Sequence, residues 1–167
     1  MILTGAPGSG KSSVLDALCT LLEIDEVSFG AIESEYFSRG WPWLSFSEEL
    51  AQLAAIVELQ REAGRDTFLV VVTTEDEQDL RATIAALGAD QVIVVCLTAP
   101  PAIVAERVAC REPDAWPGKA RLIEHSRLLA EQIPAIPGID ARYGTVDRTP
   151  FEVARDIREL LAARWSV

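Results

Sequence analysis

The segment Gly5–Ser12 limits the possible folds of this chain more than any other part of its sequence. It reads Gly-Ala-Pro-Gly-Ser-Gly-Lys-Ser and matches the pattern G-x-x-x-x-G-K-S/T. Residues 1–4 before it form a short apolar stretch typical of a strand. From Lys11 to about Leu22 apolar residues recur at helical spacing, at Val14, Ala17, Leu18 and Leu21. The sequence therefore predicts a strand, a glycine-rich loop and a helix in direct succession.

A loop of this composition is suited to holding phosphate groups. Glycine lets the backbone curl so that successive N–H groups point at an anion, and the following helix adds its positive end. In this pattern Lys11 reaches the β- and γ-phosphates and the Ser12 hydroxyl binds magnesium. An ordinary glycine-rich turn is disfavoured, because Lys11 is one of only two lysines in the chain. The predicted phosphate-binding residues are Gly5, Ala6, Pro7, Gly8, Ser9, Gly10, Lys11, Ser12 and Ser13.

Strand-like and helical segments alternate along the rest of the chain. Further strands are predicted at residues 27–29, 68–72, 92–97 and 142–146. Helices are predicted at residues 46–63, 74–87, 100–111, 120–132 and 149–163. Capping-box spacing marks three of the helix starts, at Ser45 and Glu48, Thr74 and Glu77, and Thr149 and Glu152. This alternation predicts a single α/β domain over residues 1–167, with a parallel sheet covered by helices on both faces.

Composition narrows the possible partners. The 26 acidic and 15 basic residues give a formal net charge of −11, which disfavours nucleic acid because phosphate contacts need clustered Lys and Arg. No apolar stretch approaches the roughly 18 residues that a membrane span needs, so no membrane partner is expected. The chain begins without a basic, signal-like segment. We therefore expect a cytoplasmic protein.

The cysteines and the single histidine are expected to have structural roles. Cys19, Cys96 and Cys110 show no CxxC spacing and are interpreted as small buried residues in a reducing compartment. His125 lies in a polar helical stretch, and the chain has no GxSxG motif. It is therefore predicted on a helix surface rather than in a zinc or hydrolase site.

With the phosphate loop and the order of elements, the whole chain resembles the small P-loop kinases. This group contains shikimate, gluconate and nucleoside-monophosphate kinases and chloramphenicol phosphotransferase. The resemblance implies a three-layer P-loop NTPase fold whose five-stranded parallel sheet has the order 2-3-1-4-5. It also implies ATP with Mg2+ as the phosphoryl donor. It leaves the oligomeric state open.

An acidic pair often follows the second strand in this family. Here Glu33 and Glu35 follow the strand predicted at residues 27–29. A carboxylate at this position can orient an acceptor hydroxyl and accept its proton. Which of the two acts, or whether they form only a solvated acidic turn, stays open. The end of the next strand, residues 72–76, lacks a hydrophobic run that closes directly on Asp, so the Walker-B equivalent is also undecided.

Candidates for contact with the acceptor come from two further segments. Residues 36–43 hold four aromatic side chains, and we expect Trp41 to wall a pocket with Arg39 on an anionic group. Alternatively, these aromatic side chains anchor the loop to the core or to a second subunit. Arg81 resembles the acceptor-binding arginine of related kinases, although an ordinary surface salt bridge is the favoured interpretation.

The third set of candidates resembles the lid of this family. Arg107 and Arg111 lie four residues apart on one helix and directly precede the loop 112–119. The resemblance implies that these arginines close over ATP and stabilise charge on the transferring phosphoryl group, while a surface ion-pair cluster is the alternative. Arg148, in the segment 147–150, is a candidate for the adenine side of the nucleotide.

Together these features predict an ATP-dependent phosphotransferase that moves the γ-phosphoryl group to a hydroxyl of a small-molecule acceptor. The absence of an N-K-x-D motif argues against a GTPase. A nucleotide kinase is the alternative within enzymes. A non-catalytic ATP-binding module is the alternative of another class, and the weak Walker-B position motivates it.

Overall fold

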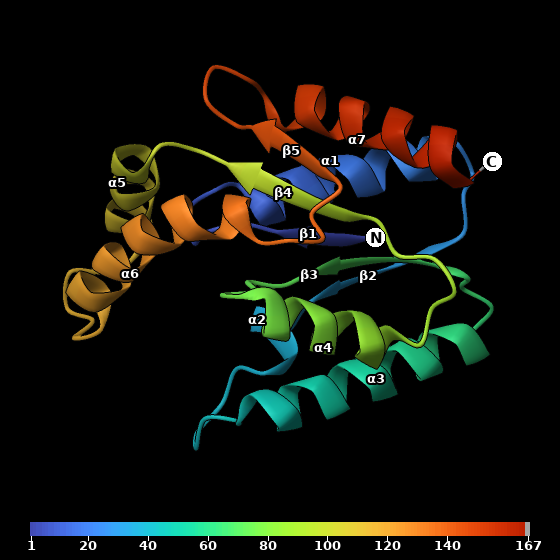
Figure 1. The fold of residues 1–167 in the computed structure, drawn as a ribbon, viewed down its shortest axis with the longest axis horizontal. Coiled ribbons are helices and arrows are strands. Elements are labelled where there is room, and N and C mark those ends of the chain that lie inside the picture. The colour runs from blue at the N-terminus through green and yellow to red at the C-terminus, as the bar shows by residue number, and fades with distance from the viewer. Residues whose placement is uncertain (166–167) are drawn as a thin grey trace.

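Five parallel strands form the centre of the molecule, in the order β2-β3-β1-β4-β5 (Figure 1). The computed structural model describes residues 1–165. The predicted α/β fold and strand order are confirmed. In register, Ile2 of the central strand lies beside Val70 on one side and Val94 on the other. The strands are β1 (Ile2–Thr4), β2 (Phe29–Glu33), β3 (Thr67–Val71), β4 (Val94–Thr98) and β5 (Ala141–Gly144).

Helices cover both faces of the sheet (Figure 1). Helices α1 and α7 pack on one face, and α3, α4 and α6 pack on the other. None of the described helices is long and apolar enough to cross a membrane. The helices are α1 (Lys11–Ile24), α2 (Ser34–Phe37), α3 (Phe46–Glu62), α4 (Glu77–Leu87), α5 (Pro101–Arg111), α6 (Lys119–Gln132), the short 3-10 turn η1 (Ile133–Ala135) and α7 (Pro150–Trp165).

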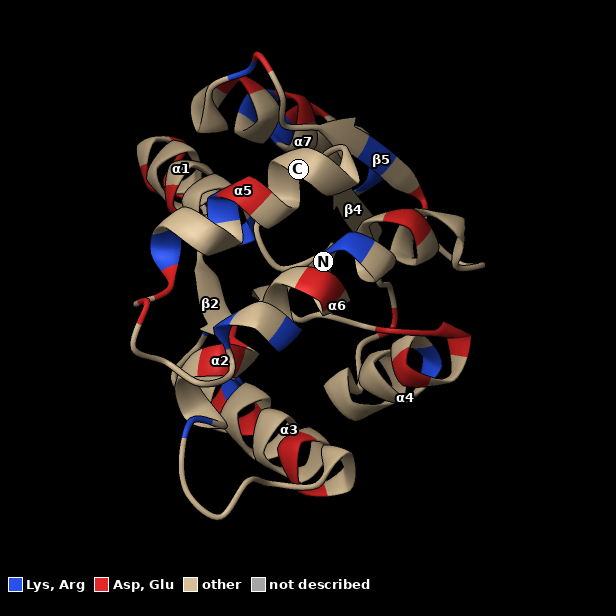
Figure 2. Ribbon diagram, turned by 90° about the vertical axis from the view of Figure 1, so that its left-hand side faces the viewer, with Lys and Arg blue, Asp and Glu red and all other residues tan. Residues whose placement is uncertain are grey.

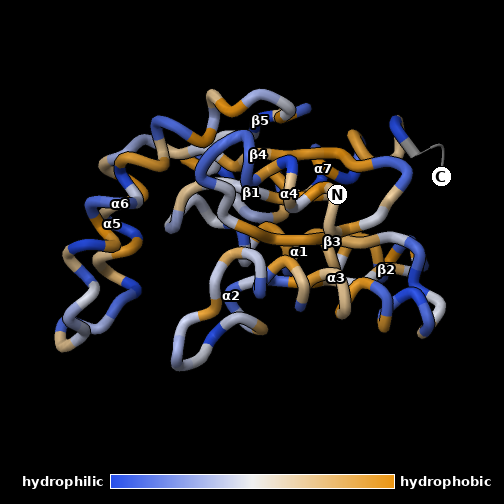
Figure 3. The backbone as a smooth tube through the Cα atoms, turned by 60° about the horizontal axis from the view of Figure 1, so that its bottom comes forward, coloured by the Kyte–Doolittle hydropathy of each residue, from blue (hydrophilic) through white to orange (hydrophobic). Residues whose placement is uncertain are grey.

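The core consists of two apolar layers, because neighbouring strand residues point to opposite faces. Ile2 belongs to the layer that contains Leu53 of α3, whereas Leu3 belongs to the layer that contains Leu18 of α1 and Ile157 of α7. In Figure 3 the strands β1, β3 and β4 lie in the middle of the molecule, where hydrophobic residues are concentrated. This double-sided burial explains why the central strands read as continuous apolar runs.

The second strand begins later than its sequence indicates. The expectation of a strand at residues 27–29 is wrong for its first two residues, because Val27 N–H donates to Leu22 O at 3.0 Å and completes the end of α1. The paired stretch runs from Phe29 to Glu33, beside residues 67–71 of β3. Glu33 is therefore the last residue of the strand rather than part of the turn after it.

The start of α4 also differs from the expected cap. Thr74 does not cap the helix, since its hydroxyl group lies 3.0 Å from that of Thr4 in the core. Asp76 caps α4 instead, and its carboxylate accepts the Asp79 N–H at 2.9 Å. The capping boxes predicted at Ser45 and Thr149 are both present.

The cysteines and the loop after α5 need smaller corrections. Cys96 is buried as expected, but Cys19 is half-buried and Cys110 is exposed. Cys110 lies in the last turn of the amphipathic helix α5, on the side away from the core. Lys119 begins α6, so the predicted loop 112–119 ends one residue earlier.

Candidate active site

The glycine-rich loop follows β1 and curls against β4 and α5, where its glycines are sterically required. A Cβ atom on Gly5 would lie 2.5 Å from Leu97 O, and one on Gly8 would lie 2.6 Å from Val104 O. Both residues also have positive φ, which side chains rarely adopt. The loop leads into α1 at Gly10, as an anion site at a helix N-terminus requires.

Lys11 lies buried beside the loop, with 7% of its surface exposed. Its Nζ donates to Gly5 O at 2.8 Å and to Ala6 O at 3.3 Å. Burial lowers the pKa of this ammonium to about 8; the charge of Arg111 acts in the same direction, and the Glu35 and Glu33 carboxylates oppose it. The predicted residues from α1, β2, α2 and α5 therefore act on one amine.

Ser12 joins the loop to the second strand. Its hydroxyl, at the amino end of α1, donates at 2.8 Å to Glu33 Oε2, at the carboxyl end of β2. A hydroxyl and a carboxylate are hard oxygen donors of the kind Mg2+ prefers. The residues present therefore fit the metal that accompanies a nucleoside triphosphate, with Ser12 and Glu33 on its protein side.

Arg107 and Arg111 have different surroundings although they share a helix. Arg107 donates to Gly8 O at 3.2 Å, to Thr145 Oγ1 at 3.0 Å and to Thr145 O at 3.0 Å. It thus ties the phosphate loop to the segment after β5 and is not part of a surface ion-pair cluster. Arg111 is half exposed and pairs with Glu112 at 2.7 Å.

Several predicted residues lie away from the loop. Arg148 donates to Glu152 O at 2.9 Å and pairs with Asp156 at 2.7 Å along α7, so its guanidinium is turned from the loop toward the helix. Arg81 pairs with Glu77 and has 76% of its side chain exposed. The expected pocket wall of residues 36–43 is not formed by Trp41, which is 85% exposed, nor by Arg39, which is also exposed.

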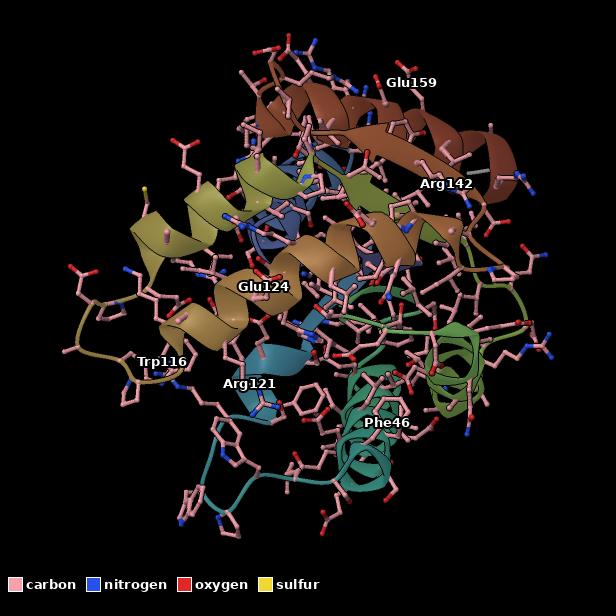
Figure 4. The ribbon with its side chains drawn as sticks, turned by 60° about the vertical axis from the view of Figure 1, so that its left-hand side comes forward. Phe46, Trp116, Arg121, Glu124, Arg142 and Glu159 are labelled. Atoms are coloured by element: carbon pink, nitrogen blue, oxygen red, sulfur yellow. The ribbon has the colours of Figure 1, made fainter. Side chains whose placement is uncertain are left out.

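A cavity of about 280 Å³ lies beside Glu33 and Glu35, between α2, α3, α4 and the end of β3. Ser34, which separates Glu33 from Glu35, is part of its wall, so the cavity adjoins the phosphate loop. Figure 4 shows Phe46 at the start of α3, on this side of the molecule. The lining residues are Ser34, Phe37, Phe46, Glu49, Leu50, Leu53, Val72, Thr73, Glu75, Asp79 and Thr83.

A larger cavity of about 550 Å³ lies at the opposite edge of the sheet, around Met1 and residues 66–68 and 87–92. These residues border the amino ends of β1, β3 and β4. Ligands of open α/β sheets bind outside the carboxyl ends of the strands, where the phosphate loop also lies. The smaller cavity is therefore the candidate acceptor pocket.

His125, on α6, contacts a residue of this cavity. The expectation of a helix-surface residue is incomplete, because its Nε2 lies 2.8 Å from Glu75 Oε1, a residue of the cavity wall. Sequence reasoning did not single out Glu49, Asp79 or Thr145 as site residues. Glu49 and Asp79 have the spacing of ordinary helix surface acids, so no local signal marks them.

Comparison with known proteins supports the fold. Neither a protein-family model nor a curated protein matches the sequence of this chain. Among solved structures, a sugar kinase from Janibacter sp. HTCC2649 is 16% identical with a TM-score of 0.68, covering 99% of this chain and 95% of its own. A gluconokinase from Sinorhizobium meliloti 1021 is 21% identical with a TM-score of 0.61, covering 97% and 90%.

The third similar structure holds a nucleotide analogue. It is the APS kinase of Mycobacterium tuberculosis in complex with AMPPNP and APS, 20% identical with a TM-score of 0.68, covering 96% of this chain and 95% of its own. These likenesses each cover 96% or more of the chain, and so extend over its five-stranded sheet of order 2-3-1-4-5. The chain therefore has the fold of the P-loop kinases.

Proposed function

We propose that this chain is an ATP- and Mg2+-dependent kinase that phosphorylates a hydroxyl group of a small molecule. One observation carries the proposal: Lys11, the Ser12–Glu33 pair and Arg107 all meet at one glycine-rich loop. The names of the similar structures, a sugar kinase, a gluconokinase and an APS kinase, support the same class of reaction.

In the proposed reaction the acceptor oxygen forms a bond to the γ-phosphorus of ATP, and the bond from this phosphorus to the β–γ bridging oxygen breaks to leave ADP. The hydroxyl proton passes to Glu35. We assign it this role because Glu33 is engaged with Ser12, whereas none of the described residues donates a hydrogen bond to the Glu35 carboxylate. A bound Mg2+ would neutralise charge on the phosphates.

Arg107 and Arg111 have different proposed roles toward the phosphate groups. Arg107 fixes the loop against Thr145 and thereby keeps the backbone N–H groups in place. Arg111 is close enough for its charge to act on Lys11, and its guanidinium, half exposed and paired through Nε with Glu112, would meet the transferring phosphoryl group. Planar guanidinium groups suit this task because they grip two phosphate oxygens at once.

The alternatives have less support. A nucleotide kinase needs arginines on the acceptor phosphate, but Arg39 is exposed and Arg81 pairs with Glu77. A non-catalytic module was suggested by the weak end of β3. Glu33 supplies a carboxylate to Ser12 from β2, so the site does not depend on β3 for one.

Calorimetry with ATP and Mg2+ tests nucleotide binding. Lys11→Ala is expected to weaken ATP affinity by at least an order of magnitude, since charge-assisted contacts contribute about 1.5–3 kcal/mol. The matched control is Arg65→Ala, an exposed cation that contacts Gln60 at the other end of the molecule. Equal affinity of wild-type and Lys11→Ala protein would contradict the proposal.

A further inference from the structure

The cavity beside the phosphate loop is acidic. Three of its lining residues are carboxylic acids, Glu49 of α3, Glu75 of the β3–α4 loop and Asp79 of α4, and none is Lys or Arg. Figure 2 shows acidic residues on α2 and α3 and along the segment that enters α4. These acids come from separate elements, so the fold and not a local sequence run brings them together.

The charges in this cavity are largely uncompensated by the protein. Within residues 1–165, no Lys or Arg forms an ion pair with Glu49 or Asp79; the Glu75 carboxylate pairs with His125, and the Glu75 N–H donates to the Asp79 carboxylate at 3.3 Å. Burial raises the pKa of Glu49 and of Asp79, and hydrogen bonds from Ser38 to Glu49 and from the Glu75 N–H to Asp79 oppose the rise only in part. For Asp79 the neighbouring acids Asp76 and Glu75 add to it. A cation bound between them would relieve this cost.

The nearby cations are directed elsewhere. Arg81 faces Glu77 on the outer surface of α4. Arg121, in the first turn of α6, extends toward α2, one wall of the cavity (Figure 4), but it is exposed and is not among the lining residues. His125 is not a lining residue, and it contacts the cavity wall through the Glu75 carboxylate.

The remaining walls fit a compact organic ligand. Phe37, Phe46 and Leu50 are apolar, and the Thr73 hydroxyl is buried and has no hydrogen-bond partner among the described residues. A buried hydroxyl without a partner is costly unless a ligand satisfies it. At about 280 Å³ the cavity is just below the roughly 300 Å³ at which pockets for drug-sized ligands begin. It is therefore suited to a single sugar-sized ring.

We propose that this cavity binds the acceptor, and that the acceptor is a compact amino sugar or amino alcohol that carries a positive charge. The inference rests on the kinase function proposed above. The ammonium group lies between Glu49 and Asp79, Thr73 takes a hydroxyl group, and another hydroxyl faces Ser34 and Glu35.

The charge of the acceptor also selects the atom that reacts. A protonated amine has no lone pair, so a hydroxyl oxygen attacks the γ-phosphorus. The bond between that phosphorus and the bridging oxygen breaks, ADP leaves with the electron pair, and the hydroxyl proton goes to Glu35. The product is an O-phosphorylated amine.

Probes of similar size and hydroxyl content that differ in charge test the proposal. The dissociation constants of D-glucosamine, D-glucose and D-gluconate are measured by calorimetry, with and without Mg2+ and a non-hydrolysable ATP analogue. A second pair, 2-deoxystreptamine and myo-inositol, repeats the comparison on a cyclitol. The cationic member of each set is expected to bind about tenfold or more tightly than the neutral one, and gluconate least, since a charged hydrogen bond contributes about 1.5–3 kcal/mol.

Substitutions then test whether Glu49 and Asp79 cause the preference for the cationic probe. Glu49→Gln and Asp79→Asn are each expected to remove most of the preference for the cation while leaving nucleotide affinity unchanged. The control is Glu58→Gln on the solvent side of α3, where Glu58 pairs with Arg61 and is 64% exposed. Equal binding of the probes, binding of none of them, or the same loss in Glu58→Gln would overturn the inference. Failure of the ATP analogue to bind would instead overturn the proposed function, since the nucleotide-free titrations still measure the cavity.

Discussion

Among single residues, Lys11 is subject to opposing demands from folding and from ligand binding. It is 7% exposed, and its pKa is lowered to about 8. Burial without full charge compensation disfavours the ammonium in the free protein. A bound triphosphate needs that same ammonium.

The pH dependence of Lys11 follows from this. ATP affinity is expected to fall as the pH rises through about 8, because the free protein then loses the proton that the phosphates require. Unfolding free energy should change in the opposite direction. Between about 8 and 10.5, the unfolded chain holds the Lys11 proton and the folded chain does not, so stability rises with pH in this window.

Calorimetry and urea unfolding over pH 7 to 10.5 check both effects against Lys11→Met, which removes the titrating group. Affinity and stability profiles that are unchanged by Lys11→Met would show that another group titrates.

Glu33 and Glu35 are expected to differ in their effects. Glu35→Gln should lower turnover by roughly a hundredfold to ten-thousandfold, as for a lost general base, with little change in ATP affinity. Glu33→Gln should instead raise the Mg2+ concentration needed for half-maximal rate, because its carboxylate faces Ser12. Steady-state rates over a Mg2+ titration separate the two; identical profiles would refute the division of roles.

Among the elements, α5 carries two arginines with different surroundings, and a loop, residues 112–118, connects it to α6. Arg107 holds the phosphate loop through Gly8 and Thr145. Arg111 remains at the surface beside Glu112. The same helix thus contacts the phosphate loop at one turn and presents a half-exposed charge at the next.

Arg111→Ala is therefore expected to lower turnover much more than it weakens nucleotide binding, since it acts on charge that develops during transfer. Arg111→Lys should not restore the rate fully, because an ammonium lacks the planar fork. Kinetics and calorimetry on the same preparations measure the difference. The loop 112–118 should also be protected from protease when ATP analogue and acceptor are both bound; unchanged cleavage together with a normal Arg111→Ala rate would mark it as an ordinary loop.

The cap of α4 gives a stability test. Asp76→Ala should lower the unfolding free energy by about 1 kcal/mol, as loss of an N-cap does. Gln78→Ala is the matched control, since Gln78 is exposed in the first turn of the same helix. Urea unfolding compares them. Equal stability of the two variants would show that the Asp76 hydrogen bond contributes nothing.

For the whole molecule, the sequence predicts the architecture well because strong local signals mark its parts. The apolar runs of β3 and β4, the glycine-rich loop and the capping residues Ser45 and Thr149 each define an element without tertiary information. The resemblance to P-loop kinases then supplied the strand order, which the structure shows.

The parts that could not be predicted depend on contacts between distant residues. The start of β2 is set by pairing with β3, and Thr74 is drawn from its expected cap to Thr4, 70 positions away. The acidic cavity joins Glu49 to Asp79 across two helices. The residue pattern of neither helix predicts that these two carboxylates line the same cavity.

The most direct measurement of the central claim follows the labelled γ-phosphate of ATP. Wild-type protein is incubated with Mg2+, labelled ATP and sugars, amino sugars, shikimate-like acids, antibiotics and nucleosides in turn. The proposed kinase function predicts label on the hydroxyl of a small-molecule product, with the transfer abolished in Lys11→Ala and reduced by roughly a hundredfold or more in Glu35→Gln. Tight ATP binding by the wild type with no label transferred to any acceptor would contradict it and identify a nucleotide-binding module instead.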